Sequence, residues 1–443
     1  DPVKFLPSSD DERAEMLAAI GVGSVEDLFA DVPAEFRTTR KPPIGKPQSE
    51  IEVRRELGSV SARNAHARTH AHFLGAGCYH HYVPAIADQT LYREEWLSSY
   101  TPYQPEISQG TLQSIFEWQT HLAILTGMEV ANASLYEGAT ALVEALLMAS
   151  RLAKGRHRAV ISTNIHPEYR ETVRTYFGNL HFEVLEVADE EIAKRCDAET
   201  FAVAVQSPDF FGRVRGWKEA RAAASACGAM AVGVVAEAIS LALLSPPGDA
   251  GLDIACGEAR SLGVPMSYGA PALGFLACRD AHKRQMPGRL AGETVDAEGK
   301  RAFCLTLSTR EQHIRREKAT SNICTNQGLM ALASNVYLSL MGKAGLRETA
   351  VQCVSKAEYL KEKIAAVSGF AIATDGPTFN EFAVRGPKPA REIVAALAEK
   401  GILAGVPLAT WLPDRERDFL VAVTEMNTKA EMDVYAAELA RIR

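Results

Sequence analysis

The stretch FAVAVQSPDFFGRVRGWKEARAAASACGAMAVGVV, residues 201–235, holds two apolar runs with a helical stretch between them. The runs Phe201–Val205 and Ala229–Val235 are apolar throughout instead of alternating, which is typical of strands buried on both faces of a parallel sheet. The helix predicted over Trp217–Cys227 stops at Gly228, a residue suited to a helix C-cap. This strand–helix–strand unit predicts an α/β fold.

The same alternation continues on both sides of this unit. Further buried strands are predicted at Ala159–Ser162, Phe182–Val187, Asp253–Ala255 and Leu273–Ala277. Helices are predicted over Gly138–Lys154, with Gly155 as its C-cap, and over Pro167–Phe177. Strands that alternate with helices predict a doubly wound, mainly parallel sheet with helices on both faces, which we assign to residues 110–328.

Two further segments flank this large domain. Residues 1–109 predict an arm of short helices and extended chain, and Ser9 with Glu12 has the pattern of a capping box. Residues 329–443 predict a smaller α+β domain. That domain is expected to begin and end with helices, over Leu329–Met341 and Lys429–Ile442.

Composition excludes several classes of protein. The chain has 443 residues, of which 47% are hydrophobic and 23% charged, so it is neither a disordered chain nor a disulfide scaffold. With 55 acidic and 48 basic residues it carries a net charge of −7, which disfavours nucleic-acid binding. The most apolar stretch, Ala229–Leu244, is too short to span a bilayer. Eight cysteines without close pairing indicate free thiols and a cytoplasmic location.

The first candidate site is the loop that runs from Tyr100 to residue 110. Tyr103, Gln104, Glu106 and Ser108 lie on the same loop, which two prolines make rigid. Phenol, amide, carboxylate and hydroxyl groups on a rigid loop are suited to binding a small polar substrate. A packed loop with its hydroxyl groups bonded to the backbone is the alternative, and the residues alone leave both open.

A second candidate is the helix start at Gly138, Ala139 and Thr140. The free N–H groups of a first helical turn, together with a threonine hydroxyl, can hold an anion such as a phosphate. Many strand-to-helix turns use glycine and threonine for structural reasons alone. An anion site and a plain helix start therefore both remain possible on the residues alone.

Two further segments carry charged or ligating side chains. The neighbouring His80 and His81 point in different directions on any regular backbone, which makes them a poor metal pair. The upstream His66, His70 and His72 have no evident acidic third ligand, so structural histidines are expected here and no metal site. Residues 309–326 combine five basic groups with a hydroxyl-rich turn. This segment predicts either an anion or partner site, or a solvated charged face.

Five long runs together resemble one known family. They are FLGAGCYHHYVP (73–84), YTPYQPEISQGTLQSIFEWQ (100–119), NASLYEGATALVEALLMA (132–149), GEARSLGVPMSYGAPALGF (257–275) and REQHIRREKATSNICTNQ (310–327). In this order they closely resemble the glycine decarboxylase P-proteins, in the bacterial form whose N-terminal, or alpha, half is a separate chain. The resemblance extends from near the N-terminus to Glu425.

The resemblance implies a fold-type-I pyridoxal-phosphate architecture, in which a lysine of the large domain binds the cofactor as an aldimine. This chain has no lysine between Lys218 and Lys283. Arg260 falls near the expected position, and a guanidinium does not act as the nucleophile. Glu237 matches the acidic residue that contacts the pyridine nitrogen. We therefore expect no covalently bound cofactor here, and Gly138–Thr140 would be a relic of a phosphate loop.

The resemblance also implies partners and a reaction. Pyridoxal phosphate is expected on a companion beta subunit in an α2β2 heterotetramer, which decarboxylates glycine and transfers its aminomethyl group to the lipoyl arm of H-protein. Tyr100 and Tyr103 are expected to contact the glycine carboxylate, and His80 and His81 to belong to the same wall. Two alternatives stay open: a purely structural or regulatory partner, and an independent pyridoxal-phosphate enzyme that uses another lysine.

Overall fold

The computed structural model describes residues 7–38, 40, 43–97, 101–269 and 271–442 of the chain. It divides into two compact units, residues 1–64 and residues 65–443. Each unit is described by itself below. The three-segment division predicted from the sequence remains a prediction.

The described residues of the first unit form the helices α1 (Asp10–Ile20) and α2 (Glu50–Ser61) and two short 3-10 turns (Glu26–Phe29 and Ala34–Phe36). The capping box predicted at Ser9 and Glu12 is present, because each side chain bonds the backbone N–H of the other residue. Neither helix buries a residue within this unit. Local capping therefore defines these helices more than packing does.

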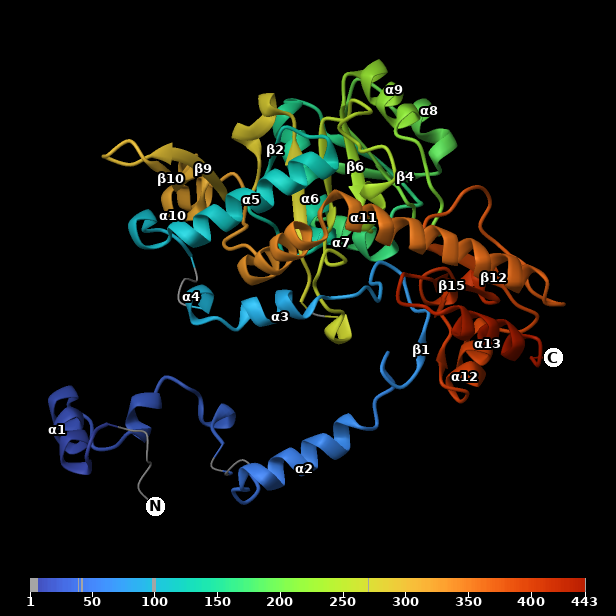
Figure 1. Ribbon diagram of the computed structural model, residues 1–443. Coiled ribbons are helices and arrows are strands. Elements are labelled where there is room, and N and C mark those ends of the chain that lie inside the picture. Colours follow the sequence, from blue (N-terminus) through green and yellow to red (C-terminus); the bar gives the residue numbers. More distant parts are fainter. Residues whose placement is uncertain (1–6, 39, 41–42, 98–100, 270, 443) are drawn as a thin grey trace. The chain divides into compact units, whose positions relative to one another are not determined.

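The centre of the second unit is a seven-stranded sheet with the order β2-β8-β7-β6-β5-β3-β4 (Figure 1). In that order the strands span Val130–Ala131, Gly274–Cys278, Ile254–Glu258, Met230–Val235, Thr200–Gln206, Arg158–Ser162 and Glu183–Val187. The four pairings from β7 to β4 are parallel. β8 is antiparallel to both of its neighbours, so the sheet is mainly parallel with an antiparallel edge.

Helices cover both faces of this sheet, as a doubly wound fold requires. One face packs against α5 (Gln109–Thr126), α9 (Lys218–Cys227) and α11 (Gly328–Ala365), and the other packs against α6 (Gly138–Leu152) and α7 (Pro167–Phe177). Successive residues of β5 serve opposite faces: Val203 and Val205 meet the first set of helices, whereas Ala202 and Ala204 meet the second. Both faces are thus buried, which explains the continuous apolar runs.

A smaller antiparallel sheet, with the order β11-β12-β15-β14, lies in the C-terminal part of the chain. Its strands span Ala371–Ile372, Glu381–Arg385, Asp418–Ala422 and Val406–Pro407. The second half of α11, α12 (Ala390–Ala398) and α13 (Lys429–Leu439) share a buried cluster with it. Figure 1 shows α11 extending from the large sheet to this smaller one.

The remaining elements are short. They are β1 (Ala71–His72), which pairs with β13 (Ile402–Leu403), the hairpin of β9 (Leu290–Val295) and β10 (Arg301–Thr306), and the helices α3 (Ala85–Leu91), α4 (Glu94–Leu97), α8 (Ile192–Arg195) and α10 (Gln312–Arg315). Among the helices in the described ranges, none is both long and apolar enough to cross a bilayer.

Three features of the fold differ from the sequence expectation. The run that ends at Ala277 forms a strand antiparallel to β7, although it is as apolar as the parallel strands of the sheet. The hairpin of β9 and β10 was not predicted. The helix predicted to end at Met341 does break there, at Gly342, whose φ is 57°, but a second helical stretch that was not predicted extends α11 to Ala365. Glycine adopts this left-handed backbone without the strain that other residues incur.

Candidate active-site region

The segment Gly75–Tyr82 crosses the side of the large sheet where its parallel strands end, and we call it the crossing segment. Glu381 of β12 accepts hydrogen bonds from the backbone N–H of Ala76 at 2.6 Å and from the hydroxyl of Tyr79 at 2.8 Å. The imidazole of His166 contacts the Ala76 carbonyl at 2.9 Å. Burial raises the pKa of Glu381 to about 7. The crossing segment thus joins the large and small sheets through buried polar contacts.

Two carboxylates occupy the amino end of α6, where the sequence left open either an anion site or a plain helix start. Glu258 Oε2 accepts the N–H of Gly138 at 3.2 Å, and the side chain of Glu137 accepts the N–H of Thr140 at 2.8 Å. Ala139 between them is buried. A carboxylate is stabilised at a helix amino end for the same reasons as a phosphate. The chain therefore supplies its own anions to this turn.

Arg260 lies beside Glu258, in the position where the resemblance placed the missing lysine. The second oxygen of Glu258 accepts hydrogen bonds from the backbone N–H of Arg260, at 3.0 Å, and from the backbone N–H of Leu273, at 2.8 Å. The guanidinium of Arg260 bonds the Cys78 sulfur at 3.0 Å and the Gly269 carbonyl at 2.9 Å. Burial raises the pKa of Glu258, and its N–H donors and Arg260 oppose that rise.

His81 of the crossing segment is held between two carboxylates. Its Nε2 lies 3.2 Å from Glu237 Oε2, and its Nδ1 lies 2.8 Å from Glu425 Oε2. Burial by itself would lower the pKa of His81. The carboxylate of Glu237 and the hydrogen bonds outweigh burial, so the pKa of His81 lies well above its usual value. Glu237 is therefore paired within the chain. His80 turns away, and its ring packs against that of His72.

A separate cavity of about 450 Å³ opens beside the loop that carries Tyr103. Its lining includes Tyr103, His313, Arg316, Asn322 and Cys324, so it joins the first candidate loop to the basic segment 309–326. The rings of Tyr103 and His313 meet edge to face with centroids 5.2 Å apart. We call this space the Tyr103 cavity.

A buried arginine supports the wall of the Tyr103 cavity. Arg289 is 3% exposed, and its Nη2 lies 3.4 Å from the Tyr103 hydroxyl and 2.8 Å from the Cys324 carbonyl. Its guanidinium also lies 5.5 Å from the centroid of the Tyr103 ring. Arg289 and the neighbouring Arg310 share one carboxylate, Glu311, at 3.8 and 3.9 Å. Glu311 and Glu317 line the cavity together with Arg316, so cations and carboxylates meet at this wall, and the buried Arg289 guanidinium lies against the Tyr103 hydroxyl.

The other predicted site residues lie outside this cavity. Gln104 and Glu106 are exposed and do not line it. Ser108 is buried just before α5, without a capping hydrogen bond from its side chain. Tyr100 lies outside the described residues. His81 is committed to its two carboxylates, so the structure separates Tyr103 from the histidine that the sequence assigned to the same wall.

The comparisons with known proteins cover almost the whole chain. Residues 3–439 match the family described as "Glycine cleavage system P-protein". The chain belongs to this P-protein family. It is 49% identical to the "Probable glycine dehydrogenase (decarboxylating) subunit 1" of Xanthobacter autotrophicus, over 99% of this chain and all of the relative. The protein of the same name from Thermomicrobium roseum is 49% identical over 97% of both chains.

Solved structures agree with this P-protein assignment. A crystal structure of glycine decarboxylase (P-protein) in inhibitor-bound form matches with a TM-score of 0.88 and 41% identity, over 99% of this chain and 100% of that one. A sphingosine-1-phosphate lyase from Burkholderia pseudomallei, 17% identical, matches with a TM-score of 0.64 over 92% and 93% of the two chains. The second likeness shows the fold alone, that of fold-type-I pyridoxal-phosphate enzymes. The predicted fold class and the family resemblance are both confirmed.

Pyridoxal phosphate is the cofactor of this P-protein family, but the residues at this chain's sheet edge do not fit it. Its phosphate would need N–H groups at the start of α6, where Glu258 accepts that of Gly138 and Glu137 that of Thr140. Glu237, matched to the pyridine-binding acid, is bonded to His81. Arg260 has no neutral amine to offer. No reaction step is therefore assigned to a cofactor held at this edge.

Sequence reasoning missed three residues of these sites: Glu258, Glu425 and Arg289. Glu258 stands two residues before Arg260 inside a run already linked to the family, and that proximity was a usable signal. Arg289 lies beyond the quoted runs, and Glu425 marked only the end of the resemblance. Their roles depend on contacts with residues more than 180 positions away, which no local pattern reveals.

Proposed function

We propose that the chain is the alpha subunit, subunit 1, of glycine dehydrogenase (aminomethyl-transferring, decarboxylating) in the glycine cleavage system. The observation that carries this proposal is full-length similarity, at 49% identity, to proteins named as that subunit. Arg260, Glu258 and His81 support a division of labour between subunits, because each is bonded within the chain where a cofactor would be needed. We accordingly propose that the PLP-bearing subunit is the partner.

In this proposal the chain contributes the Tyr103 cavity as one wall of a shared active site. Glycine presents a carboxylate, and the cavity combines the Tyr103 hydroxyl with the charge of Arg289 behind it. Hydrogen bonds between charged and polar groups in a partly dry site are stronger than in water. The role of Tyr103 is then to bind and orient the substrate carboxylate, while the partner performs the bond cleavage.

The finer features of the assembly are also proposals. A subunit 1 implies at least one partner subunit, and we propose an α2β2 heterotetramer in the cytoplasm. The lipoyl arm of H-protein would receive the aminomethyl group at the shared site. The basic segment 309–326 contributes His313 and Arg316 to the lining of the Tyr103 cavity. We place this cavity at the active site shared with the partner subunit.

The test uses the complex reconstituted from both subunits and lipoylated H-protein. Tyr103→Phe removes one hydroxyl, and we expect the KM for glycine to rise about tenfold, because one hydrogen bond to a charged group is lost. Release of carbon dioxide from carboxyl-labelled glycine measures this. Tyr176→Phe is the matched control, because Tyr176 is an exposed tyrosine of α7 that does not line the cavity.

Two outcomes would favour the alternatives. An unchanged KM with intact assembly, followed by size-exclusion chromatography, would indicate a structural or regulatory partner. A stoichiometric phosphopyridoxyl adduct on this chain, found by mass spectrometry after borohydride reduction, would indicate an independent enzyme. An adduct on the partner subunit alone supports the proposal.

A further inference from the structure

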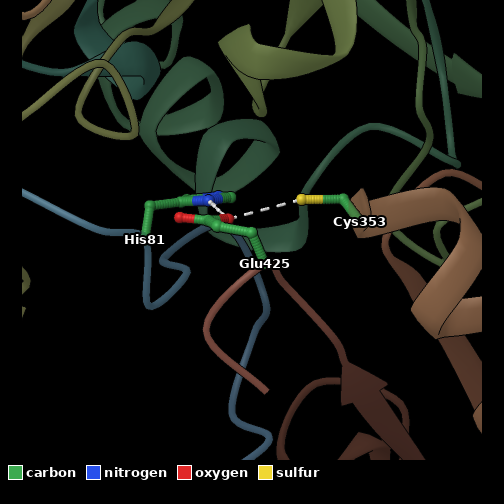
Figure 2. A group of neighbouring side chains, drawn as sticks. All are labelled: His81, Cys353 and Glu425. Carbon is green, nitrogen blue, oxygen red and sulfur yellow. Dashed lines mark hydrogen bonds and ion pairs between the residues drawn. The ribbon is translucent and has the colours of Figure 1, made fainter. Parts of the chain in front are cut away.

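Three side chains from distant parts of the chain meet at one buried point: His81 of the crossing segment, Cys353 of α11 and Glu425, which follows β15. Figure 2 shows the Glu425 carboxylate between the other two side chains. Its Oε2 lies 2.8 Å from His81 Nδ1 and 3.5 Å from Cys353 Sγ. All three ligand atoms lie within 4.8 Å of one another. Imidazole, thiol and carboxylate are the ligands that zinc uses in proteins.

A second carboxylate orients the imidazole from its other side. Glu237 Oε2 lies 3.2 Å from His81 Nε2, and the other oxygen of Glu237 accepts the N–H of Ile239 at 2.9 Å. The other oxygen of Glu425, Oε1, likewise accepts the N–H of Tyr82 at 2.6 Å. A metal-bound histidine usually donates its second ring N–H to a carboxylate in this way. The surroundings of the three ligand atoms are therefore already in place.

We propose that His81 Nδ1, Cys353 Sγ and Glu425 Oε2 bind one divalent cation of the zinc class. Tetrahedral coordination sets the ligand atoms about 3.3–3.6 Å apart. The sulfur–oxygen distance of 3.5 Å already meets this spacing, and the nitrogen–oxygen distance of 2.8 Å must open by about half an ångström. The fourth position is left for water, because the second oxygen of Glu425 accepts the N–H of Tyr82.

The charge of the cluster supports the binding of a divalent cation in exchange for protons. Without the cation, the two carboxylates of Glu237 and Glu425 lie against His81, whose pKa they raise, and burial raises the pKa of the Cys353 thiol, so both groups favour their protonated forms. With it, the imidazole is neutral, the thiol is a thiolate and the cation adds two positive charges. Two protons leave as one cation enters, so the buried groups keep the same net charge in both forms. Cation binding therefore adds no net buried charge, and no extra desolvation cost of that kind opposes it.

The site is structural rather than catalytic. The side chain of His81 is 3% exposed and Cys353 is fully buried, whereas Glu425 keeps 13% exposure and marks the side from which a cation enters. Its ligands come from three regions, so binding would tie the crossing segment to α11 and to the small sheet. The sequence predicted no metal here, because the adjacent His80 and His81 point in different directions and make a poor metal pair.

Cobalt(II) is the probe, because its thiolate complexes have absorption bands that zinc complexes lack. The full chain is treated with a chelator, then titrated with Co²⁺ in weak buffer containing a pH indicator. We expect a sulfur-to-cobalt charge-transfer band that saturates at one equivalent, with about two protons released per cation. Added Zn²⁺ should abolish the band, since zinc binds such sites more tightly than cobalt.

The variants locate the site. Cys353→Ser should remove the charge-transfer band, whereas Cys324→Ser, which alters an exposed thiol, should leave it unchanged. Should Cys353→Ser not fold, as judged by circular dichroism, Glu425→Gln serves instead, and we expect it to weaken Co²⁺ binding at least tenfold. Absence of the band in the unaltered chain, its loss in Cys324→Ser, or full-strength binding by Glu425→Gln would each overturn the proposal.

Discussion

Two charged regions of this chain differ in how completely their groups are paired. At the edge of the large sheet, Glu258 accepts three backbone N–H groups and Glu237 is bonded to His81. At the Tyr103 cavity, Arg289 and Arg310 share a single carboxylate at distances close to 4 Å. In the first region the chain's own donors hold the carboxylates, and among the buried side-chain atoms described there only the Nε of Arg260 lacks a hydrogen-bond partner, whereas in the second the Tyr103 hydroxyl and the Arg289 guanidinium lie beside an open cavity.

The difference indicates where an outside molecule can bind. A helix amino end whose N–H groups are bonded to the chain's own carboxylates offers nothing further to a phosphate. A cavity lined by a tyrosine, with an arginine behind it, can still gain energy from a carboxylate. Both regions resemble anion sites in sequence, and only their partners distinguish them. Three of the four predictions below test this distinction and one tests the crossing segment beside the sheet edge; they run from the largest expected effect to the smallest.

Replacing Glu258 tests whether the sheet edge depends on its own carboxylate. Glu258→Ala leaves three backbone N–H groups without their acceptor, and we expect the free energy of unfolding to fall by about 3–5 kcal/mol. Urea denaturation measures it. Glu298→Ala, at an exposed carboxylate, should change it by less than about 0.5 kcal/mol. A loss below about 1 kcal/mol at Glu258 would mean that water replaces the carboxylate and that the edge is open to other anions.

The buried carboxyl of Glu381 makes the contact of the crossing segment pH-dependent. Its pKa rises from 4.5 to about 7, so the folded state holds the proton more tightly than the unfolded state does. The free energy of unfolding should then fall as the pH rises from about 4.5 to 7, by on the order of 3 kcal/mol. Glu381→Gln should flatten this part of the stability profile measured by urea denaturation. A profile unchanged by the substitution would assign the titration to another group.

Removing Arg289 tests whether the Tyr103 cavity depends on its buried charge. In the reconstituted complex, Arg289→Met should lower kcat/KM for glycine about tenfold, with little effect in a Tyr103→Phe background, because Arg289 acts through the tyrosine. Arg301→Met alters an exposed arginine of β10 and should leave the rate unchanged. Equal losses in both backgrounds would assign Arg289 an effect independent of Tyr103.

Restoring a lysine at the sheet edge should have no effect on cofactor binding. Arg260→Lys provides the missing amine, but Glu258 and Glu137 still occupy the start of α6. We expect no phosphopyridoxyl adduct at position 260 after borohydride reduction, as measured by intact mass. A stoichiometric adduct there would show that the edge accepts the cofactor once an amine is present, and would remove the distinction between the two regions.

Much of the large domain was predictable from local patterns. The apolar runs around β3, β5 and β6 predict buried strands because both faces are covered, and α7 was predicted with the bounds observed, Pro167–Phe177. The direction of β8 was not predictable. Hydrophobicity reports that a strand is buried, but not whether its neighbour runs parallel, because that depends on the connection between them.

The candidate sites were predictable only in part. Tyr103 was found from its rigid loop, and the missing lysine from the family pattern around Arg260. The partners of these groups lie far along the chain: Arg289 is 186 positions from Tyr103, and Glu425 is 344 from His81. Such pairs form through tertiary packing and leave no local periodicity. For that reason the sequence predicted one wall with Tyr103 and His81, whereas in the structure Tyr103 lines the cavity and His81 lies between Glu237 and Glu425.

By itself the sequence determined the family, the doubly wound fold and the absence of a lysine where the cofactor would attach. These properties follow from residue identity and from short-range periodicity, which the backbone imposes on each segment. Tertiary structure alone decided which charges are paired: Glu258 at the start of α6, His81 between two carboxylates, and Arg289 behind Tyr103. The strength of a charge in a protein depends on its burial and its neighbours, and only the folded chain specifies both.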